Sequence, residues 1–184
     1  MDAVCIVCNS NDVKLTVNGI RYCKECLDKE REEYFKYDRS RTKLFPEINE
    51  IINDKLYLGN YDQAKDLNTL KKFKISHILM CGTFLEKMFP DSFVYEHFEI
   101  EDTIEENISK FFKRGIEFIE NSDVVFVHCH AGVSRSASIV IAYIMHKFKI
   151  GYEDAYKIVK NKRREIFPNE SFRNQLREFE KDIL

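Results

Sequence analysis

The chain has 184 residues, of which 44% are hydrophobic and 33% charged, and its formal net charge at pH 7 is -2. This length allows one domain with a full hydrophobic core and a small appendage, and the composition is that of a globular protein. The slight negative charge disfavours general binding to nucleic acid or to a membrane surface, since both favour a basic excess. The longest apolar run, Ala137 to Met145, is much shorter than the roughly 20 residues of a membrane-spanning helix.

The sequence begins with Met1 and Asp2 and has no basic stretch followed by an apolar one, so we expect no secretory signal. We expect a cytoplasmic protein, with a nuclear location as the alternative, in a compartment where thiols stay reduced. The basic run from Lys160 to Arg164 would suit a nuclear signal or a docking patch. On a helix, however, such a run is usually a solvated face, and we prefer that interpretation.

Composition divides the chain into a cysteine-bearing module with a charged linker, residues 1–41, and a larger domain, residues 47–184. The charge-dense stretch 24–41 predicts a solvated helix and linker. In the larger domain, apolar runs and helical spacing predict a strand at 48–52, a strand at 56–59, a helix at 62–73, a strand at 76–81, a strand at 93–100, a helix at 107–120, a strand at 124–127 and helices at 136–148, 152–164 and 170–184. This order predicts an α/β fold with a central, mostly parallel sheet flanked by helices.

The segment from His128 to Ser136 joins the β-branched run to an apolar helix. A loop between a strand and a helix N-terminus directs successive backbone N–H groups at one anion. We expect this loop to bind phosphate through the backbone of a glycine-centred turn and through the planar donors of an arginine. The residues concerned are His130, Ala131, Gly132, Val133, Ser134 and Arg135.

Cys129 stands at the start of this loop, where the amides and the helix N-terminus favour its thiolate and make it a nucleophile. The alternative is a buried core cysteine, but the joint spacing of Cys129, Gly132, Arg135 and Ser136 favours chemistry. We expect the Ser136 hydroxyl to donate a hydrogen bond to the sulfur when the sulfur leaves. His128 is expected to orient the loop from below.

The stretch from His128 to Ser136, with the apolar helix after it, resembles the signature of the dual-specificity phosphatases, a branch of the protein tyrosine phosphatase superfamily. The resemblance runs from about Ile48 to the end of the chain and includes Leu56–Asn60, His77–Leu79, Ala155, Val159–Lys160, Arg163, Pro168–Asn169, Phe172, Gln175, Leu176 and Phe179–Glu180. It implies a protein tyrosine phosphatase-like fold. It also implies hydrolysis of phosphotyrosine and phosphoserine or phosphothreonine in proteins through a phosphocysteine, with no cofactor in catalysis.

Transfer of phosphate to Cys129 requires a proton for the departing oxygen, which a carboxylic acid beside the pocket would supply. The residues alone leave six candidates open: Asp91, Glu99, Glu101, Asp102, Glu105 and Glu106. The resemblance of Ile100–Asp102 and the following Asn107–Ile108 to the family's acid loop implies that Asp102 is the acid. In the second step the same residue would act as the base that activates water.

The first part of the chain carries two Cys-x-x-Cys pairs, formed by Cys5, Cys8, Cys23 and Cys26. In a reducing compartment this spacing predicts a closed, structural four-thiolate zinc site, a zinc knuckle. The plain family pattern lacks such a module. Its positive and negative charges offset each other, which favours contact with a protein partner or structural support over nucleic-acid binding.

Cys81, the remaining cysteine, ends the strand expected beside the catalytic one. We interpret it as a small core residue. The resemblance offers a second interpretation, in which Cys81 captures an oxidised Cys129 as a disulfide and protects it from further oxidation.

The sequence is therefore compatible with three functions. The first is a phosphatase for phosphoproteins, and the second is the same chemistry on a phosphoinositide or an RNA 5′-phosphate. The loop positions carry His130, Ala131, Val133 and Ser134 and no lysine, which favours phosphoproteins over highly anionic substrates. The third is an adaptor with weak activity whose main part is the zinc module, and the intact nucleophile argues against it. A rhodanese-type transferase is disfavoured by the loop spacing.

Overall fold

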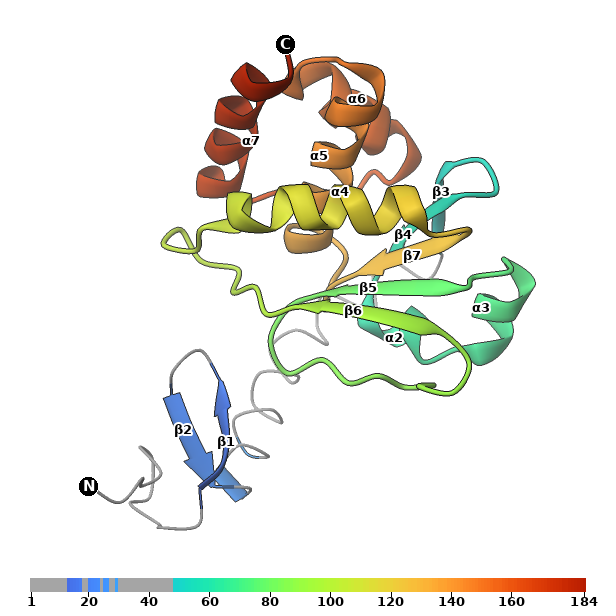
Figure 1. Ribbon diagram of the computed structural model, residues 1–184, viewed down its shortest axis with the longest axis vertical. Helices are drawn as coiled ribbons and strands as arrows, with labels where there is room; N and C mark the ends of the chain where they lie inside the picture. Colours follow the sequence, from blue (N-terminus) through green and yellow to red (C-terminus); the bar gives the residue numbers. More distant parts are fainter. Residues whose placement is uncertain (1–12, 18–19, 24, 27–28, 30–47) are drawn as a thin grey trace.

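The computed structural model describes residues 13–17, 20–23, 25–26, 29 and 48–184 (Figure 1). Two short strands, β1 (Val13–Val17) and β2 (Ile20–Cys23), form an antiparallel pair. The expected charged helix at 24–41 falls almost entirely outside the described residues, as do Cys5 and Cys8. In the part of the chain that is described, no helix is long and apolar enough to span a bilayer.

The larger domain is built on a five-stranded sheet in the order β3-β4-β7-β5-β6. The strands are β3 (Asn49–Ile52), β4 (Leu56–Gly59), β5 (His77–Cys81), β6 (Val94–Phe98) and β7 (Val125–His128). Only the β3–β4 pair among these neighbours is antiparallel. The prediction of a mostly parallel sheet is therefore confirmed. β7 lies in the middle of the sheet, so its carboxyl end lies beside the carboxyl ends of its parallel neighbours. This is the edge of the sheet at which α/β proteins bind ligands.

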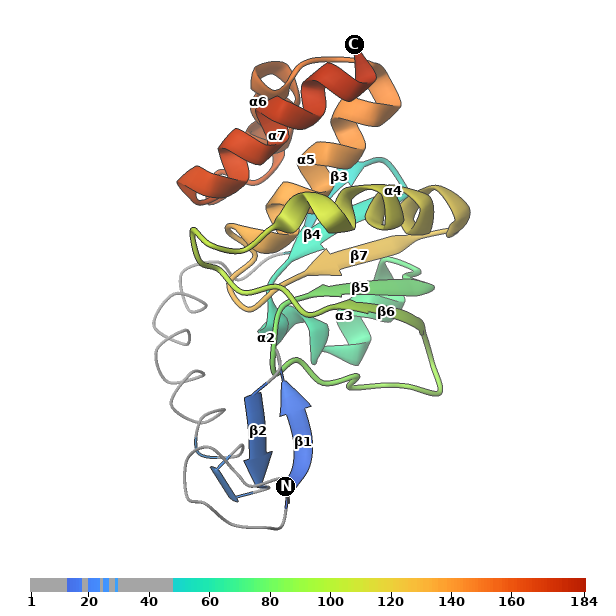
Figure 2. The same cartoon turned by 60° about the vertical axis from the view of Figure 1, so that its left-hand side comes forward.

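Helices cover both faces of the sheet, as Figures 1 and 2 show from two sides. The short helices α2 (Tyr61–Ala64) and α3 (Leu67–Lys72) lie on one face. The larger helices lie on the other, and they are α4 (Phe112–Asn121), α5 (Arg135–Phe148), α6 (Tyr152–Lys162) and α7 (Glu170–Ile183). A single 3-10 turn, η1 (Ile108–Phe111), leads into α4.

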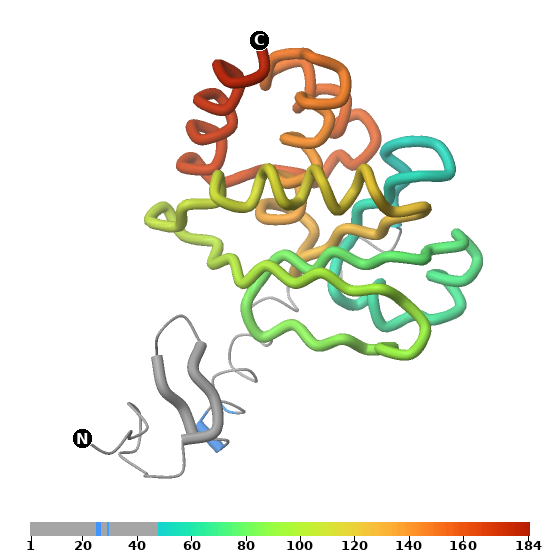
Figure 3. The backbone as a smooth tube through the Cα atoms, in the orientation of Figure 1, coloured from blue at the N-terminus to red at the C-terminus, as the bar shows by residue number. Residues whose placement is uncertain are grey.

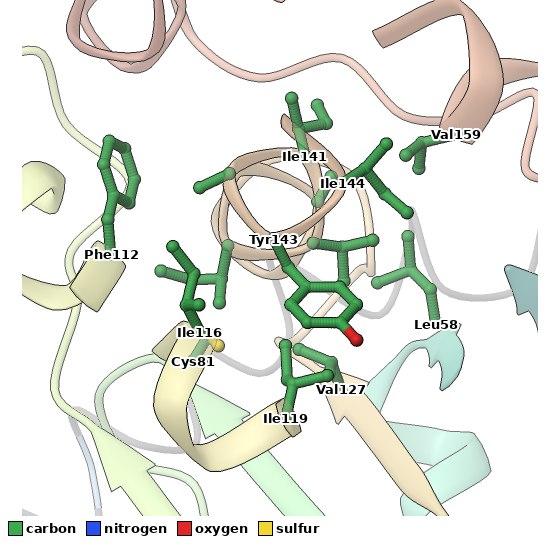
Figure 4. Close-up of a cluster of buried hydrophobic side chains, with 14 of the residues drawn as sticks. Leu58, Cys81, Phe112, Ile116, Ile119, Val127, Ile141, Tyr143, Ile144 and Val159 are labelled. Atoms are coloured by element: carbon green, nitrogen blue, oxygen red, sulfur yellow. The ribbon is translucent and has the colours of Figure 1, made fainter. Parts of the chain in front are cut away.

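Side chains alternate along each strand between two hydrophobic clusters, because successive residues of a strand point to opposite faces. Leu58 and Val127 belong to the cluster under α4–α7, whereas Tyr57 and Phe126 belong to the cluster under α2 and α3. The larger cluster surrounds α5, whose residues are buried continuously from its first turn through Met145 (Figure 4). Burial on every side explains why the sequence of this helix is apolar rather than amphipathic, and it gives the loop before α5 a rigid base.

Two predicted helices differ from the structure at their boundaries. The stretch 62–73 is two helices, because Asn60 caps α2 in a capping box with Gln63 and Asp66 caps α3 independently. The helix predicted from 107 begins as the 3-10 turn η1 and becomes α-helical only at Phe112. The strand predicted at 93–100 is confined to β6, and the rest of it begins a long connection to η1 (Figure 3).

Candidate active site

The loop after β7 turns sharply into α5 around Cys129. Gly132 has φ of +68°, and a Cβ atom there would lie 2.3 Å from the carbonyl oxygen of Gly59 on β4. Only glycine fits both the left-handed backbone and the close approach of that neighbouring strand. The turn brings the Gly132 N–H to 3.2 Å from Cys129 Sγ. The hydroxyl of Ser136, the second residue of α5, also donates to Sγ at 3.2 Å. The sulfur thus receives two hydrogen bonds, one from the turn and one from α5.

The two histidines of the loop are buried and brace it from behind. His128 lies between the rings of Phe126 and Tyr61, at centroid distances of 5.4 and 5.9 Å. The Nε2 atom of His130 lies 2.8 Å from the carbonyl oxygen of Thr83. Burial lowers the pKa of each imidazole to about 3. Both rings are therefore neutral near pH 7, which suits a supporting role and makes neither a source of protons for the reaction.

Arg135 and Asp102 face each other across the mouth of the loop. Arg135 is the first residue of α5 and is 3% exposed, and its Nε lies 3.7 Å from Asp102 Oδ2. The other carboxylate oxygen, Oδ1, accepts a hydrogen bond from the Ser134 hydroxyl at 2.7 Å. Glu106, another candidate acid from the sequence, instead accepts the Glu101 N–H and pairs with a lysine. The structure thus brings Asp102 to the nucleophilic loop.

Arg163, absent from the predicted site, holds the outer side of the loop. Its buried guanidinium donates to the carbonyl oxygens of Gly132 at 2.9 Å and Ala131 at 3.3 Å, and to Asn49 Oδ1 on β3 at 2.6 Å. Burial lowers the pKa of Arg163 from its usual value, yet arginine stays protonated. In a trans peptide the C=O and the N–H point in opposite directions, so the N–H groups of Gly132 and Val133 are turned to the inner side of the loop, where the Gly132 N–H meets Cys129 Sγ.

The position of Arg163 also bears on the basic run from Lys160 to Arg164. This run is not one solvated patch, because Arg163 is buried and the Lys160 ammonium donates to the carbonyl oxygen of Ile166. Arg163 differs from its neighbours in its place at the C-cap of α6, from which its guanidinium reaches back toward β3 and the loop. The residue types of the basic run do not reveal this.

Asn169 was likewise not predicted as a site residue. Its side-chain amide donates to Asp102 Oδ1 at 3.0 Å and to the carbonyl oxygen of Thr103 at 3.2 Å. Its backbone N–H donates to the Ser134 hydroxyl at 3.1 Å, and its Oδ1 caps α7 by accepting the Phe172 N–H. One residue therefore connects the candidate acid, the nucleophilic loop and the last helix.

Cys81 lies at the end of β5 and is completely buried. Burial raises the pKa of its thiol well above the usual value, and the neighbouring Cys129 raises it further. The thiol is therefore protonated at neutral pH, as expected of a core residue. A disulfide between Cys81 and an oxidised Cys129 stays a prediction.

The four predicted zinc ligands are only partly described. Cys23 is the last residue of β2, and the buried Cys26 lies in the helical turn that follows. Cys5 and Cys8 lie outside the described residues. Within the described ranges no cluster of three or more histidine, cysteine or acidic side chains is placed to hold a metal. The four-cysteine site accordingly stays a prediction.

Comparisons with known proteins place the larger domain in a family. The protein-family model described as "Dual specificity phosphatase, catalytic domain" matches residues 56–182 of this chain. Dual specificity protein phosphatase 1B of Arabidopsis thaliana is 35% identical over 136 residues, which cover 72% of this chain and 81% of that protein. The chain belongs to the dual specificity phosphatase family.

Two further similarities show how the domain is used elsewhere. MAP kinase phosphatase with leucine-rich repeats protein 1 of Dictyostelium discoideum is 41% identical over 139 residues, which cover 74% of this chain and only 16% of that relative. Among solved structures, a human tyrosine phosphatase-like serine/threonine/tyrosine-interacting protein is 39% identical with a TM-score of 0.70, covering 73% of this chain and 96% of that one. The matched region thus makes up 81% of one relative and only 16% of another.

Proposed function

We propose that this chain is a protein phosphatase that hydrolyses phosphotyrosine and phosphoserine or phosphothreonine through a phosphocysteine on Cys129. The observation that carries the proposal is the convergence on one loop of a sulfur with two hydrogen-bond donors, a buried arginine and a carboxylate. The family and the names of the relatives, dual specificity protein phosphatases and a MAP kinase phosphatase, support a phosphoprotein substrate.

In the first step the Cys129 thiolate attacks phosphorus while Arg135 and the loop N–H groups bind the non-bridging oxygens. The bond from phosphorus to the leaving oxygen breaks, and Asp102 gives its proton to that oxygen. The products are the free alcohol or phenol and a phosphocysteine. The buried arginine and the glycine turn are suited to stabilise the negative charge on the phosphoryl oxygens. Their donors are already in place and need no rearrangement when the charge develops.

In the second step the Asp102 carboxylate takes a proton from water, and the water oxygen attacks phosphorus. The sulfur–phosphorus bond breaks and its electron pair returns to Cys129, whose leaving thiolate accepts the hydrogen bond from Ser136. Inorganic phosphate and the starting enzyme result. His128, His130 and Arg163 hold the loop in shape through both steps and exchange no proton with the substrate.

The substrate class is tested by a panel of phosphotyrosine peptide, phosphothreonine peptide, phosphoinositide and 5′-triphosphorylated RNA. We expect kcat/KM on the peptides to exceed that on the lipid and the RNA by at least about tenfold, a difference of roughly 1.4 kcal/mol in transition-state binding. The Cys129→Ser variant, measured in parallel, gives the activity of contaminants, which is subtracted. A preference for the lipid or the RNA would instead establish the same chemistry on a non-protein phosphoester.

We further propose that Cys5, Cys8, Cys23 and Cys26 hold one structural zinc ion in a cytoplasmic protein. Four thiolates in two Cys-x-x-Cys pairs are the donor set that zinc prefers, and such a closed site leaves no position for substrate. The placement of Cys23 at a strand end and of Cys26 in the turn after it is typical of a knuckle. The module would then contact a protein partner or stabilise its own segment.

Metal analysis of the purified full chain should give about one zinc per molecule, because a four-cysteine site binds a single ion. Zinc should be lost in Cys26→Ser and retained in Cys81→Ala, which removes a cysteine outside the predicted site. Chelation should remove the metal while kcat stays within about twofold of its starting value, since no catalytic step uses zinc. Undiminished zinc in Cys26→Ser would refute the ligand assignment.

A further inference from the structure

The connection that carries Asp102 has little core packing of its own. It runs from β6 to η1 (Figure 3). It lies between the buried Ile100 and Ile108, and the residues from Glu101 to Glu105 are all exposed. A segment with so few buried contacts is drawn from the low-stability end of a structure. General acid catalysis, however, requires the carboxyl group to be held within hydrogen-bond reach of the leaving oxygen. Something outside the connection must therefore fix its position.

The last helix contacts the connection near both ends through two side-chain amides. At one end Asn169 binds the Asp102 carboxylate and the Thr103 carbonyl. At the other end Gln175 Nε2 donates to the carbonyl oxygen of Glu106 at 2.8 Å, and Gln175 Oε1 accepts the Ser109 N–H at 3.0 Å. Gln175 thus satisfies one backbone acceptor and one backbone donor where the connection enters η1.

The helix that carries these amides is itself firmly anchored. Phe172 and Leu176 of α7 are completely buried in the larger cluster. The ring of Phe179 packs on that of Phe112 in α4, with centroids 5.1 Å apart. The Gln175 amide is also bound by its own helix, since Nε2 donates to the Ser171 hydroxyl at 3.1 Å. A side chain oriented in this way on a rigid helix fixes the position of a neighbouring loop more accurately than the loop's own few contacts do.

We propose that α7 is the positioning element of the general acid and that Gln175 is a positioning residue of the reaction, acting together with Asn169. This inference rests on the proposed function, because it assigns Gln175 a role through Asp102. Gln175 does not touch the substrate. It holds the connection at η1 so that Asp102 stays against Ser134 and Arg135 before any substrate arrives. A displacement of about 1 Å in such a group costs up to about a hundredfold in rate.

The test uses the dependence of kcat on the leaving group. A good leaving group such as p-nitrophenol departs with little help from an acid, whereas phenol needs the proton. We expect Gln175→Ala to lower the ratio of kcat on phenyl phosphate to kcat on p-nitrophenyl phosphate by about tenfold. The matched control is Asn174→Ala, the neighbouring amide on the same helix, whose Oδ1 binds Arg177 instead. That control should leave the ratio within about twofold of wild type.

An Asp102→Asn background separates positioning from general structural damage. Once the proton donor is absent, Gln175→Ala should lower the ratio no further, because the two changes remove the same function. An additive loss in the double variant would overturn the proposal. Hydrogen exchange of residues 101–107 supplies a readout other than activity, and it should accelerate in Gln175→Ala while exchange in β7 stays unchanged. Unchanged exchange in the connection would likewise overturn it.

Two failures are distinguishable in this design. If wild type shows no turnover that depends on Cys129, the proposed function fails. If wild type turns over and Gln175→Ala keeps the ratio of Asn174→Ala, only the role of Gln175 fails. Should Gln175→Ala not fold, Gln175→Glu serves in its place, because it keeps the acceptor for the Ser109 N–H but loses the donor to Glu106. The same fall in the ratio is expected there, and an unchanged ratio overturns the proposal.

Discussion

A Cys129→Ser variant should lose at least about 10⁴-fold in kcat on p-nitrophenyl phosphate, since removal of a covalent nucleophile is among the most damaging changes an enzyme can undergo. A serine hydroxyl at this position stays protonated near neutral pH, whereas the donors around Sγ stabilise an anion. Oxygen is smaller than sulfur, so the two donors from Gly132 and Ser136 can both remain. The loop should therefore keep its shape.

If the variant still binds substrate but no longer turns it over, the loss comes from the missing nucleophile and not from a misfolded loop. Calorimetry with a phosphotyrosine peptide should give a Kd within about fivefold of the KM of wild type, because Arg135 and the loop N–H groups are untouched. Cys81→Ala is the matched control, as it removes a buried thiol from the adjacent strand. Turnover above about 1% of wild type in Cys129→Ser would exclude the phosphocysteine route, since that route is what the change removes.

An Asp102→Asn variant should lose about 10²- to 10³-fold in kcat on phenyl phosphate and much less on p-nitrophenyl phosphate. The amide has nearly the size of the carboxyl group, and its oxygen still accepts from Ser134 and Asn169. What it lacks is a proton to donate in the first step and the basicity to activate water in the second. Because these roles arise after binding, the Kd of inorganic phosphate should change by less than about threefold.

Glu105→Gln is the matched control for this variant. Glu105 lies in the same connection and is exposed, and it is one of the six acidic residues that residue types alone left open as the acid. Its kcat on both substrates should stay within about twofold of wild type, because an exposed carboxylate at the rim contributes little. Equal losses in Glu105→Gln and Asp102→Asn would mean that the negative charge of the connection, rather than a proton from Asp102, supports turnover.

The elements nearest the nucleophile were predictable because their information is local. Four consecutive β-branched or aromatic residues predict β7, and an apolar run without helix breakers predicts α5. The loop between them is contiguous, so its residues are neighbours in space as well as in sequence. The division of 62–73 into two helices was missed because it depends on side-chain caps at Asn60 and Asp66, which periodicity does not register.

The rest of the site is assembled from distant segments, and residue patterns alone do not reach it. Asp102 and Asn169 are 67 positions apart, and Gly132 and Arg163 are 31 apart. No periodic pattern connects such positions. Asp102 was chosen by the resemblance to a family, whereas Arg163, Asn169 and Gln175 occurred within that resemblance without a role. Their functions emerge only when the helices that follow the loop are folded back against it.

The hydrogen bonds from Arg163 to the loop carbonyls have a consequence for shortened forms of this chain. A chain that ended before residue 163 would retain the whole uninterrupted motif from Cys129 to Arg135 and yet have no cation behind Gly132 and Ala131. Those two carbonyls would turn to water, and the peptide planes that present donors to phosphate would lose their common orientation. The motif from Cys129 to Arg135 therefore indicates membership of the family. The ability of the loop to bind an oxyanion depends also on Arg163, which lies outside the motif.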